Sequence, residues 1–91
     1  MKVKLRLLSP LRLAVAASEL DMDFSGGTVE DLVREAGMEH PKLGEAIFTK
    51  DGELDYSINV ILNGRPLTES GMKEEIKDGD EVVLLAAAAG G

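Results

Sequence analysis

The sequence INVILNGRPL, residues 58–67, sets the expected fold of this chain. Apolar residues stand at every second position from Ile58 to Leu62, which is the period of a β-strand with a buried face. The pair Asn63-Gly64 follows, and both residue types tolerate the positive φ angles that a two-residue hairpin turn requires. A short return strand over residues 65–67 completes the predicted hairpin.

Another pair of strands is predicted nearer the start of the chain. Basic residues alternate with apolar ones over residues 2–8, and acidic residues alternate with apolar ones over residues 19–24. If these strands pair antiparallel, the basic stripe lies against the acidic stripe, and each opposite-charge pair favours the pairing by roughly 0.2–1 kcal/mol. We therefore expect a structural role, and no ligand, for the charged residues of both stripes: Lys2, Lys4, Arg6, Glu19, Asp21 and Asp23.

Residues 28–37 carry the one strong helix pattern. Thr28 is a preferred N-cap residue, and two acidic residues follow it in the first turn. Four apolar residues then fall on a single helix face: Val29, Leu32, Val33 and Ala36. Gly37 is predicted to end this helix in a left-handed conformation. Elsewhere, Pro10 either makes a turn or starts a short helix, and residues 40–48 allow a short helical turn.

A last strand is predicted over residues 81–85, after the turn Asp78-Gly79-Asp80. The order of elements is typical of the α+β class, with a mixed sheet of four to five strands and one main helix on one face. The segments NVIL and VVLL are nevertheless apolar on both faces of their strands. We therefore expect an exposed apolar patch on the uncovered face, a kind of surface that usually marks a partner-binding site.

Composition narrows the classes of function. The 91 residues are enough for one domain, and the formal net charge of −7 argues against nucleic acid and anionic membranes as partners. The first 19 residues imitate a signal peptide, but Pro10 and Arg12 interrupt its apolar part and the strand period of two fits better. No run approaches the ~18 apolar residues of a membrane span. The absence of cysteine is consistent with a reducing cytoplasm, where we expect the protein to reside.

No pattern of an enzyme or a metal site stands out. The segment FSGGTVEDL lacks both glycine-rich nucleotide-binding motifs, so a turn and an N-cap explain it. His40 is the only histidine, and without cysteine it is expected to be a surface residue rather than a metal ligand. Turn formation and a solvated face explain the remaining carboxylate pairs, which are Asp78 with Asp80 and Glu74 with Glu75.

The segments INVILNGRPL and GMKEEIKDGDEVVLL, with the closing Gly90-Gly91, resemble the ubiquitin-like sulfur carriers. This family includes the small subunit of molybdopterin synthase and the thiamine sulfur carrier; KVKLRLL, ELDMDF and GGTVEDLVREAG agree with it more loosely. The resemblance implies a β-grasp domain over residues 1–85 and a flexible C-terminal tail over residues 86–91. The segment GMKEEIKDGD is more similar to the molybdopterin and cysteine-synthesis carriers than to the shorter thiamine carriers.

The resemblance also implies a function for the tail. A ubiquitin-activating-type adenylyltransferase consumes ATP to join the Gly91 carboxylate to AMP, and a sulfur donor then leaves a thiocarboxylate there. The sulfur acceptor is expected to be the large subunit of molybdopterin synthase or an equivalent protein, and this chain a co-substrate without a bound cofactor. Six residues can extend about 20 Å into a partner's site: the tail is Ala86, Ala87, Ala88, Ala89, Gly90 and Gly91. Partner contacts are expected at Leu62 and Leu85.

Three alternatives stay open from the sequence. The chain could instead be a protein modifier joined to lysines through Gly91. It could also carry sulfur for cysteine synthesis, thiamine synthesis or tRNA thiolation. Alternatively, it could be a ubiquitin-like interaction domain that is never conjugated. Many relatives have proline where this chain has Ala86 or Ala87, and that difference leaves the choice of partner open.

Overall fold

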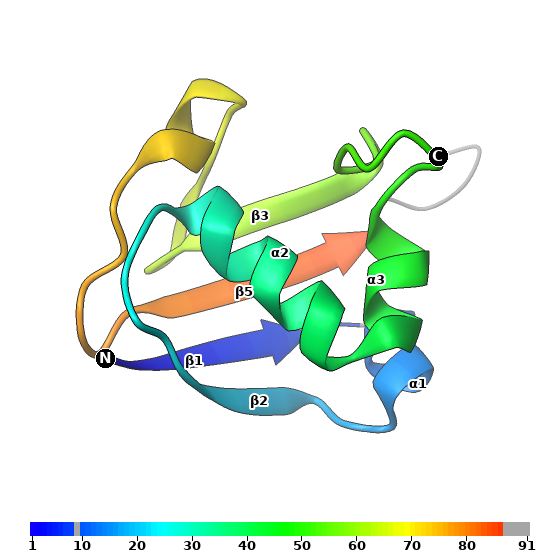
Figure 1. Cartoon of the computed structure of the whole chain (residues 1–91), viewed down its shortest axis with the longest axis horizontal. Helices are drawn as coiled ribbons and strands as arrows, with labels where there is room; N and C mark the ends of the chain where they lie inside the picture. The colour runs from blue at the N-terminus through cyan, green and yellow to red at the C-terminus, as the bar shows by residue number, and fades with distance from the viewer. Residues whose placement is uncertain (9, 87–91) are drawn as a thin grey trace.

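The computed structural model describes residues 1–8 and 10–86. Its elements follow one another from β1 to β5 with α2 as the longest helix (Figure 1). Their bounds are β1 Lys2–Leu7, α1 Leu11–Val15, β2 Glu19–Asp23, α2 Val29–Glu39, α3 Pro41–Ile47, β3 Ile58–Leu62, β4 Arg65–Pro66, the 3-10 turn η1 Ser70–Lys73 and β5 Glu81–Ala86.

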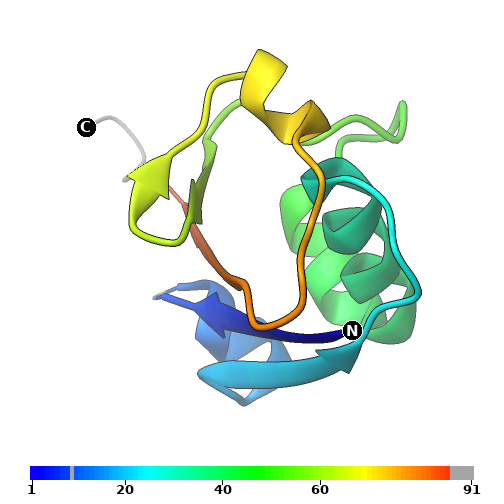
Figure 2. The same cartoon turned by 90° about the vertical axis from the view of Figure 1, so that its left-hand side faces the viewer.

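The strands form one mixed sheet in the order β2-β1-β5-β3-β4. The central strand β5 runs parallel to β1 and antiparallel to β3, whereas β2 and β4 pair antiparallel at the two edges. Helices α2 and α3 lie on the same side of this sheet (Figures 1 and 2). The prediction of an α+β fold with a mixed sheet and one main helix is therefore confirmed.

The first turn of α2 is fixed by reciprocal hydrogen bonds. The Asp31 backbone N–H donates to Thr28 Oγ1 at 3.2 Å, and the Thr28 N–H donates to Asp31 Oδ2 at 2.9 Å. The bonds from the Thr28 backbone and hydroxyl hold the pKa of Asp31 below its ordinary value. All four residues of the predicted apolar face are buried against the sheet, each no more than 1% exposed: Val29, Leu32, Val33 and Ala36.

The predicted end of this helix at Gly37 is wrong, because α2 continues to Glu39. Gly37 serves close packing instead of a left-handed turn. A Cβ atom at Gly37 would lie 2.9 Å from Cε2 of Phe48, and one at Gly44 in α3 would lie 2.7 Å from the Gly37 carbonyl oxygen. The two glycines therefore let α2 and α3 approach more closely than any larger residue allows.

The two charge stripes pair as predicted. The register sets Lys2 against Asp23 and Arg6 against Glu19. Lys2 Nζ lies 3.0 Å from Asp23 Oδ2, and Lys4 Nζ lies 3.5 Å from Glu19 Oε1. The first pair is largely exposed and the second about half exposed, so each contributes little to stability and mainly favours the correct register.

The predicted hairpin turn is confirmed. Asn63 and Gly64 have φ angles of 49° and 83°, as a turn with two left-handed residues requires. The Asn63 side chain also joins the turn to the start of β5. Its Nδ2 donates to Asp80 Oδ1 at 2.9 Å, and its Oδ1 accepts the Glu81 N–H at 2.9 Å. The asparagine thus fixes β3 relative to β5 as well as closing the hairpin.

The core lies between the inner face of the sheet and the two longer helices. Its largest fully buried side chains come from every layer: Leu5, Leu7, Leu32, Leu43, Ile47 and Leu84. Among the described residues the core includes no polar or charged side chain. Over the same residues, no helix is long and apolar enough to cross a membrane.

Candidate functional site

The end of β5 is the described part of the candidate site. The strand continues one residue further than predicted, because Ala86 pairs with Ile58 of β3 and packs against the core. Ala86 is thus part of the sheet and not the first residue of the tail. The other predicted tail residues lie outside the described part of the chain: Ala87, Ala88, Ala89, Gly90 and Gly91.

The position of β5 gives this tail a fixed starting point. Since β5 lies between β1 and β3, it is paired on both sides up to Leu84, and its last two residues, Leu85 and Ala86, pair with β3 alone. Next to its end, the Leu8 N–H donates to the Leu84 carbonyl oxygen at 3.0 Å. Five residues beyond Ala86 can reach about 17 Å from that point when extended. When a partner binds the sheet, the start of the tail therefore has a fixed position relative to that partner.

The predicted partner contact at Leu62 is wrong. Leu62 is only 4% exposed and belongs to the core, because it shares the inner face of β3 with Ile58 and Val60. The outward apolar residue of this strand is Ile61, which is half-buried. The sequence contained a signal for the outward direction of Ile61. Asn59 is polar, and Asn59 and Ile61 must share a face in a strand; the structure shows Asn59 exposed.

Leu85 does lie on the open face of the sheet. The register sets Leu85 opposite Asn59 and Val83 opposite Ile61, and directly opposed residues point to the same side. Ile61, Val83 and Leu85 are all half-buried, and we call these three residues the outer patch. The helices cover the other face of the sheet (Figure 2), so the outer patch is a partly exposed apolar surface beside the end of β5, where the sequence predicted an exposed one.

Charged side chains border the outer patch on the β1 side. Arg6 pairs in register with Val83, and its guanidinium lies 3.8 Å from Glu19 and 3.9 Å from Glu81. These three side chains are about half exposed, so a docking protein meets both signs of charge there. A polar rim around an apolar centre is the usual anatomy of a protein interface.

The carboxylates Asp78, Asp80 and Glu74 have structural roles. Asp78 Oδ1 accepts the Lys2 N–H, and Asp80 Oδ2 accepts the Lys77 N–H, each at 2.7 Å. Glu74 makes a two-pronged pair with Arg65, with both N···O distances at 2.9 Å. Hydrogen bonding from Arg65 holds the pKa of Glu74 below its ordinary value and raises that of Arg65.

The other candidate sites are likewise structural. Gly26 and Gly27 have φ angles of 130° and 138°, and the chain bends at Gly26 just before the Thr28 cap. His40 is half-buried between α2 and α3, where its N–H donates to the Ala36 carbonyl oxygen. Within residues 1–8 and 10–86, no group of three or more potential ligand side chains is placed to hold a metal ion.

Comparison with known proteins gives consistent matches over the whole chain. The family model described as the ThiS family matches residues 5–91. A protein of Archaeoglobus fulgidus, provisionally named a sulfur carrier, is 32% identical over 92 residues and is covered in full, as is this chain. Both lines of similarity therefore extend over the β-grasp fold and through the C-terminal glycines.

Solved structures agree on the fold. The crystal structure of small archaeal modifier protein 1 from Haloferax volcanii matches with a TM-score of 0.89 at 29% identity, covering all of both chains. A Pyrococcus furiosus protein, provisionally named subunit 1 of a molybdopterin converting factor, matches with a TM-score of 0.75 at 28% identity. That match covers 97% of this chain and 99% of the other. The mixed sheet and its helices are thus those of the ubiquitin-like β-grasp fold.

Proposed function

This chain belongs to the ThiS family of small sulfur carriers and modifiers, and on that premise we propose that it carries sulfur on the Gly91 carboxylate. The observation that carries the proposal is the family match over residues 5–91, which includes the Gly90-Gly91 terminus. The fold supports it, because the tail follows directly from the central strand of the sheet. In this reaction the protein is a co-substrate, and its partner supplies the catalytic groups.

The chemistry starts from an unreactive group. A carboxylate resists attack by a nucleophile until its oxygen is joined to a good leaving group. A Gly91 oxygen attacks the α-phosphorus of ATP, pyrophosphate leaves, and an acyl-adenylate forms. Sulfur at the oxidation level of sulfide then attacks the carbonyl carbon, AMP leaves, and a thiocarboxylate remains. Glycine suits this position because it places no side chain beside the attacked carbonyl.

The tail and the outer patch bind different parts of the partner. Alanine and glycine in residues 87–91 fit a narrow channel, whereas Ile61, Val83 and Leu85 offer a surface for the body of the partner. A few residues near the centre of an interface usually supply most of the binding energy. We expect the adenylyltransferase and the sulfur acceptor to bind this surface in turn, because both must reach the same carboxylate.

The acceptor we favour is the large subunit of a molybdopterin synthase. The likeness to the Pyrococcus furiosus protein named as a molybdopterin converting factor subunit supports this choice. A second candidate is conjugation to protein lysines through Gly91. The higher TM-score of 0.89 with the Haloferax volcanii modifier favours that candidate. Both functions need the same adenylate. They differ in the nucleophile that attacks its carbonyl carbon, which is sulfur for sulfur delivery and a lysine amine for conjugation.

One experiment tests the activation step. The purified protein is incubated with an adenylyltransferase of the ubiquitin-activating type from its own organism, ATP and a sulfide donor, and its intact mass is measured. The unaltered chain should gain the mass difference between sulfur and oxygen, and a variant with one alanine added after Gly91 should not. Circular dichroism of the two proteins should agree, because the addition lies outside the sheet. Thiolation of the extended variant would overturn the proposal.

A further inference from the structure

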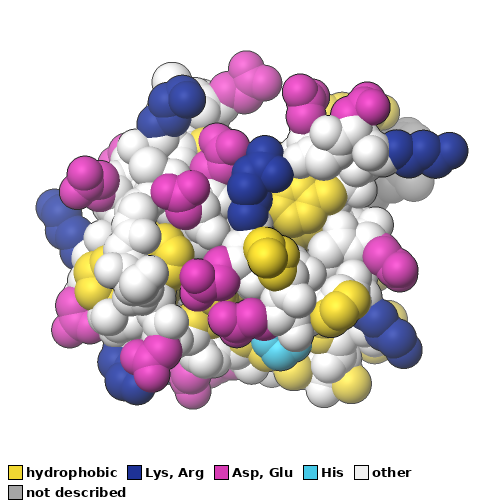
Figure 3. Space-filling view, viewed as in Figure 1, with side chains coloured by type: hydrophobic (Ala, Val, Ile, Leu, Met, Phe, Trp, Pro, Cys, Tyr) yellow, Lys and Arg dark blue, Asp and Glu magenta, His cyan; other side chains and the backbone are white. Residues whose placement is uncertain are grey.

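A groove lies on the helix side of the sheet, away from the outer patch. It has a volume of about 760 Å³ and is formed by the first half of α2, the loop from Phe48 to Tyr56, the start of β3 and the segment that includes η1. Figure 3 shows hydrophobic side chains exposed on this side of the molecule, with acidic and basic ones around them. The outer patch lies on the opposite face and does not account for this groove.

The floor of the groove is apolar. It is lined by Val33, Phe48, Leu54, Ile58, Val60, Leu67 and Met72. Val33, Ile58 and Val60 are buried, and the other four are half-buried and pack against the core. Among the described residues no polar side chain is buried there, so a small polar ligand would find no group at the bottom to orient it. The floor suits apolar side chains.

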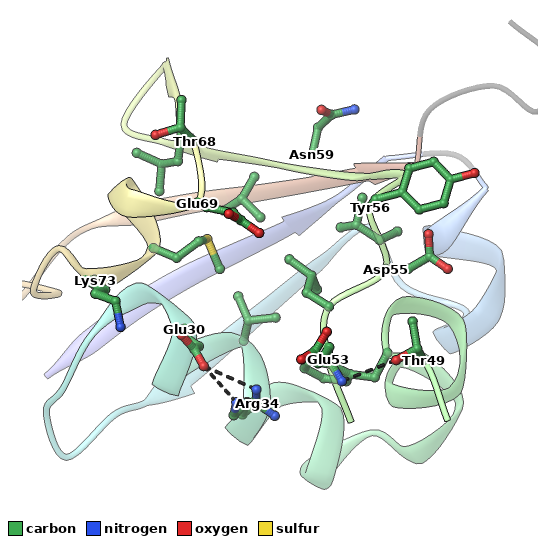
Figure 4. A pocket seen from close by; sticks show the side chains of 17 residues that line it. Glu30, Arg34, Thr49, Glu53, Asp55, Tyr56, Asn59, Thr68, Glu69 and Lys73 are labelled. Atoms are coloured by element: carbon green, nitrogen blue, oxygen red, sulfur yellow. Dashed lines mark hydrogen bonds and ion pairs between the residues drawn. The ribbon is translucent and has the colours of Figure 1, made fainter. Parts of the chain in front are cut away.

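The rim of the groove is acidic. Four carboxylates line it, against two basic side chains, Arg34 and Lys73 (Figure 4). Arg34 is occupied: it bonds to Glu30 and to the Gly52 carbonyl oxygen, and its guanidinium lies 5.4 Å from the centre of the Phe48 ring. Arg34 thereby holds the wall of the groove together. Lys73 makes no ion pair with another described residue, so the rim holds charges of both signs with an excess of negative charge.

Besides Glu30, the rim carboxylates are Glu53, Asp55 and Glu69, and these three are available to a partner. Glu53 and Glu69 make no side-chain ion pair or hydrogen bond with other described residues. Asp55 accepts bonds from the Ser57 N–H and hydroxyl, which hold its pKa below the ordinary value and keep it ionised. Negative charge above an apolar floor is complementary to a cation carried on an apolar segment.

Tyr56 adds an aromatic face to the same rim. The residue is 98% exposed, and Figure 4 shows its ring beside Asp55, on the opposite side of the groove from Lys73. Arginine and lysine bind favourably over such a ring, and a neighbouring carboxylate strengthens the attraction. Tyrosine is one of the residue types enriched among the hot spots of protein interfaces.

The open edge of β3 favours an extended peptide as the occupant. β4 pairs only with Ile61 and Leu62, and the Leu67 N–H donates to the Val60 carbonyl oxygen at 2.9 Å. By the alternation of a strand, the Ile58 carbonyl points to the same side as that of Val60, and no described residue of β4 reaches it. An added strand can use that carbonyl and place alternate side chains in the groove.

We propose that this groove binds an extended peptide segment of a partner protein in which apolar residues alternate with lysine or arginine. The apolar side chains enter the floor formed by Leu54, Leu67 and Met72, and the basic ones meet Glu53, Glu69 and Tyr56. The site is independent of the sulfur chemistry, because none of these residues lies in the outer patch or the tail.

The test titrates the full-length protein with a defined probe. The probe is the blocked pentapeptide Leu-Arg-Leu-Lys-Leu, and the control probe carries glutamate in place of both basic residues. Methyl NMR signals should shift and saturate at Leu54, Leu67 and Met72, but not at Val83 and Leu85. The acidic probe should leave all of them unchanged. Since no adenylyltransferase or ATP is present, failure here would leave the proposed activation of Gly91 untouched.

Variants locate the site. Glu69→Lys should raise the dissociation constant of the basic probe by about threefold or more, as expected for reversing one exposed charge next to the ligand. Tyr56→Ala should weaken binding by a similar factor through loss of the aromatic face. Glu45→Lys is the matched control: the same change of charge, at an exposed position in α3 outside the groove, should leave binding nearly unaltered.

Each other result overturns the proposal. Equal binding of both probes would mean simple apolar adhesion, and shifts confined to Val83 and Leu85 would place the peptide on the outer patch. Groove signals that move with protein concentration alone would identify a second copy of this chain as the occupant. Groove signals that move when residues 87–91 are deleted would identify the chain's own tail. If no signal shifted and saturated with millimolar probe, the groove would not be a peptide-binding site.

Discussion

Ala86 at the end of β5 lies opposite Ile58 at the start of β3. The tail therefore begins at the middle strand of the sheet, where the outer patch lies on one face and the acidic groove begins on the other. Ile58 itself lines the groove, whereas Leu85, one residue before Ala86, belongs to the outer patch. A partner on one face thus leaves the other face open for a second partner.

The register of β3 and β5 makes a first prediction about two leucines. Leu85→Lys should weaken binding to the adenylyltransferase strongly and change the melting temperature little, because Leu85 is only half-buried on the open face. Leu62→Ala should instead lower the free energy of unfolding by about 2–5 kcal/mol, since Leu62 is a core residue. Binding by isothermal titration and unfolding by urea measure the two effects.

The opposite pattern would contradict this assignment of faces. If Leu85→Lys unfolded the protein, Leu85 would have to be buried in solution, and the outer face would not be open. If folded Leu62→Ala lost binding completely, the buried face of β3 would have to reach the partner.

The contact between α2 and α3 supports a second prediction. Gly44→Ala should destabilise the protein by about 1–3 kcal/mol, because the new Cβ would lie 2.7 Å from the Gly37 carbonyl oxygen, a backbone atom with little freedom to move. Helix propensity alone predicts the opposite sign, a gain of about 0.8–1.0 kcal/mol. Glu45→Ala, an exposed neighbour in the same helix, should stay within about 0.5 kcal/mol of the unaltered protein. Thermal melting followed by circular dichroism decides between the signs.

The sequence predicted most of the fold because several local patterns agreed. Asn63-Gly64 fixed the hairpin, the paired charge stripes fixed β1 against β2, and the Thr28 cap fixed the start of α2. The prediction at Gly37 was wrong because a glycine near the end of a helical pattern usually indicates the end of the helix. Here a glycine is needed because the position packs against α3 and Phe48. Such a contact between distant segments leaves no local signal.

The candidate site was harder to predict for a related reason. In NVIL and VVLL both faces are apolar, so hydrophobicity alone does not say which residues point to the core. The polar Asn59 shows that Ile61 faces outward, and with it Val83. The acidic groove combines four segments of the chain, and no single stretch of sequence predicts it.

The pair Arg65–Glu74 gives a prediction about pH. The pKa of Glu74 is lowered in the folded protein, so the unfolded chain binds the proton more tightly, and the stabilisation is present above the unfolded pKa. It should be lost as the pH falls below about 5 through the folded pKa. Glu74→Gln should therefore be less stable than the unaltered protein near pH 7, and the difference should vanish in acid.

Arg65→Met supplies the control for this pair. In that background Glu74→Gln should have much less effect at either pH, because the bidentate partner is already gone. Urea denaturation of the four proteins measures the coupling. An undiminished effect of Glu74→Gln without Arg65 would assign the stabilisation to another group.

The last prediction separates sulfur delivery from protein conjugation. Lys77 is the final trypsin site of the chain, so a protein joined to a target through Gly91 leaves DGDEVVLLAAAAGG as a branch on the target's lysine. Conjugation to many lysines requires a loosely selective acceptor, whereas the apolar outer patch fits one dedicated partner better. We expect cells of the source organism to hold mostly the free protein and its thiocarboxylate, with few branched peptides in a trypsin digest. A variant lacking Gly91 gives the background of that digest. Abundant branches on many proteins that persist when molybdopterin synthesis is disabled would place conjugation first, in line with the likeness to the Haloferax volcanii modifier.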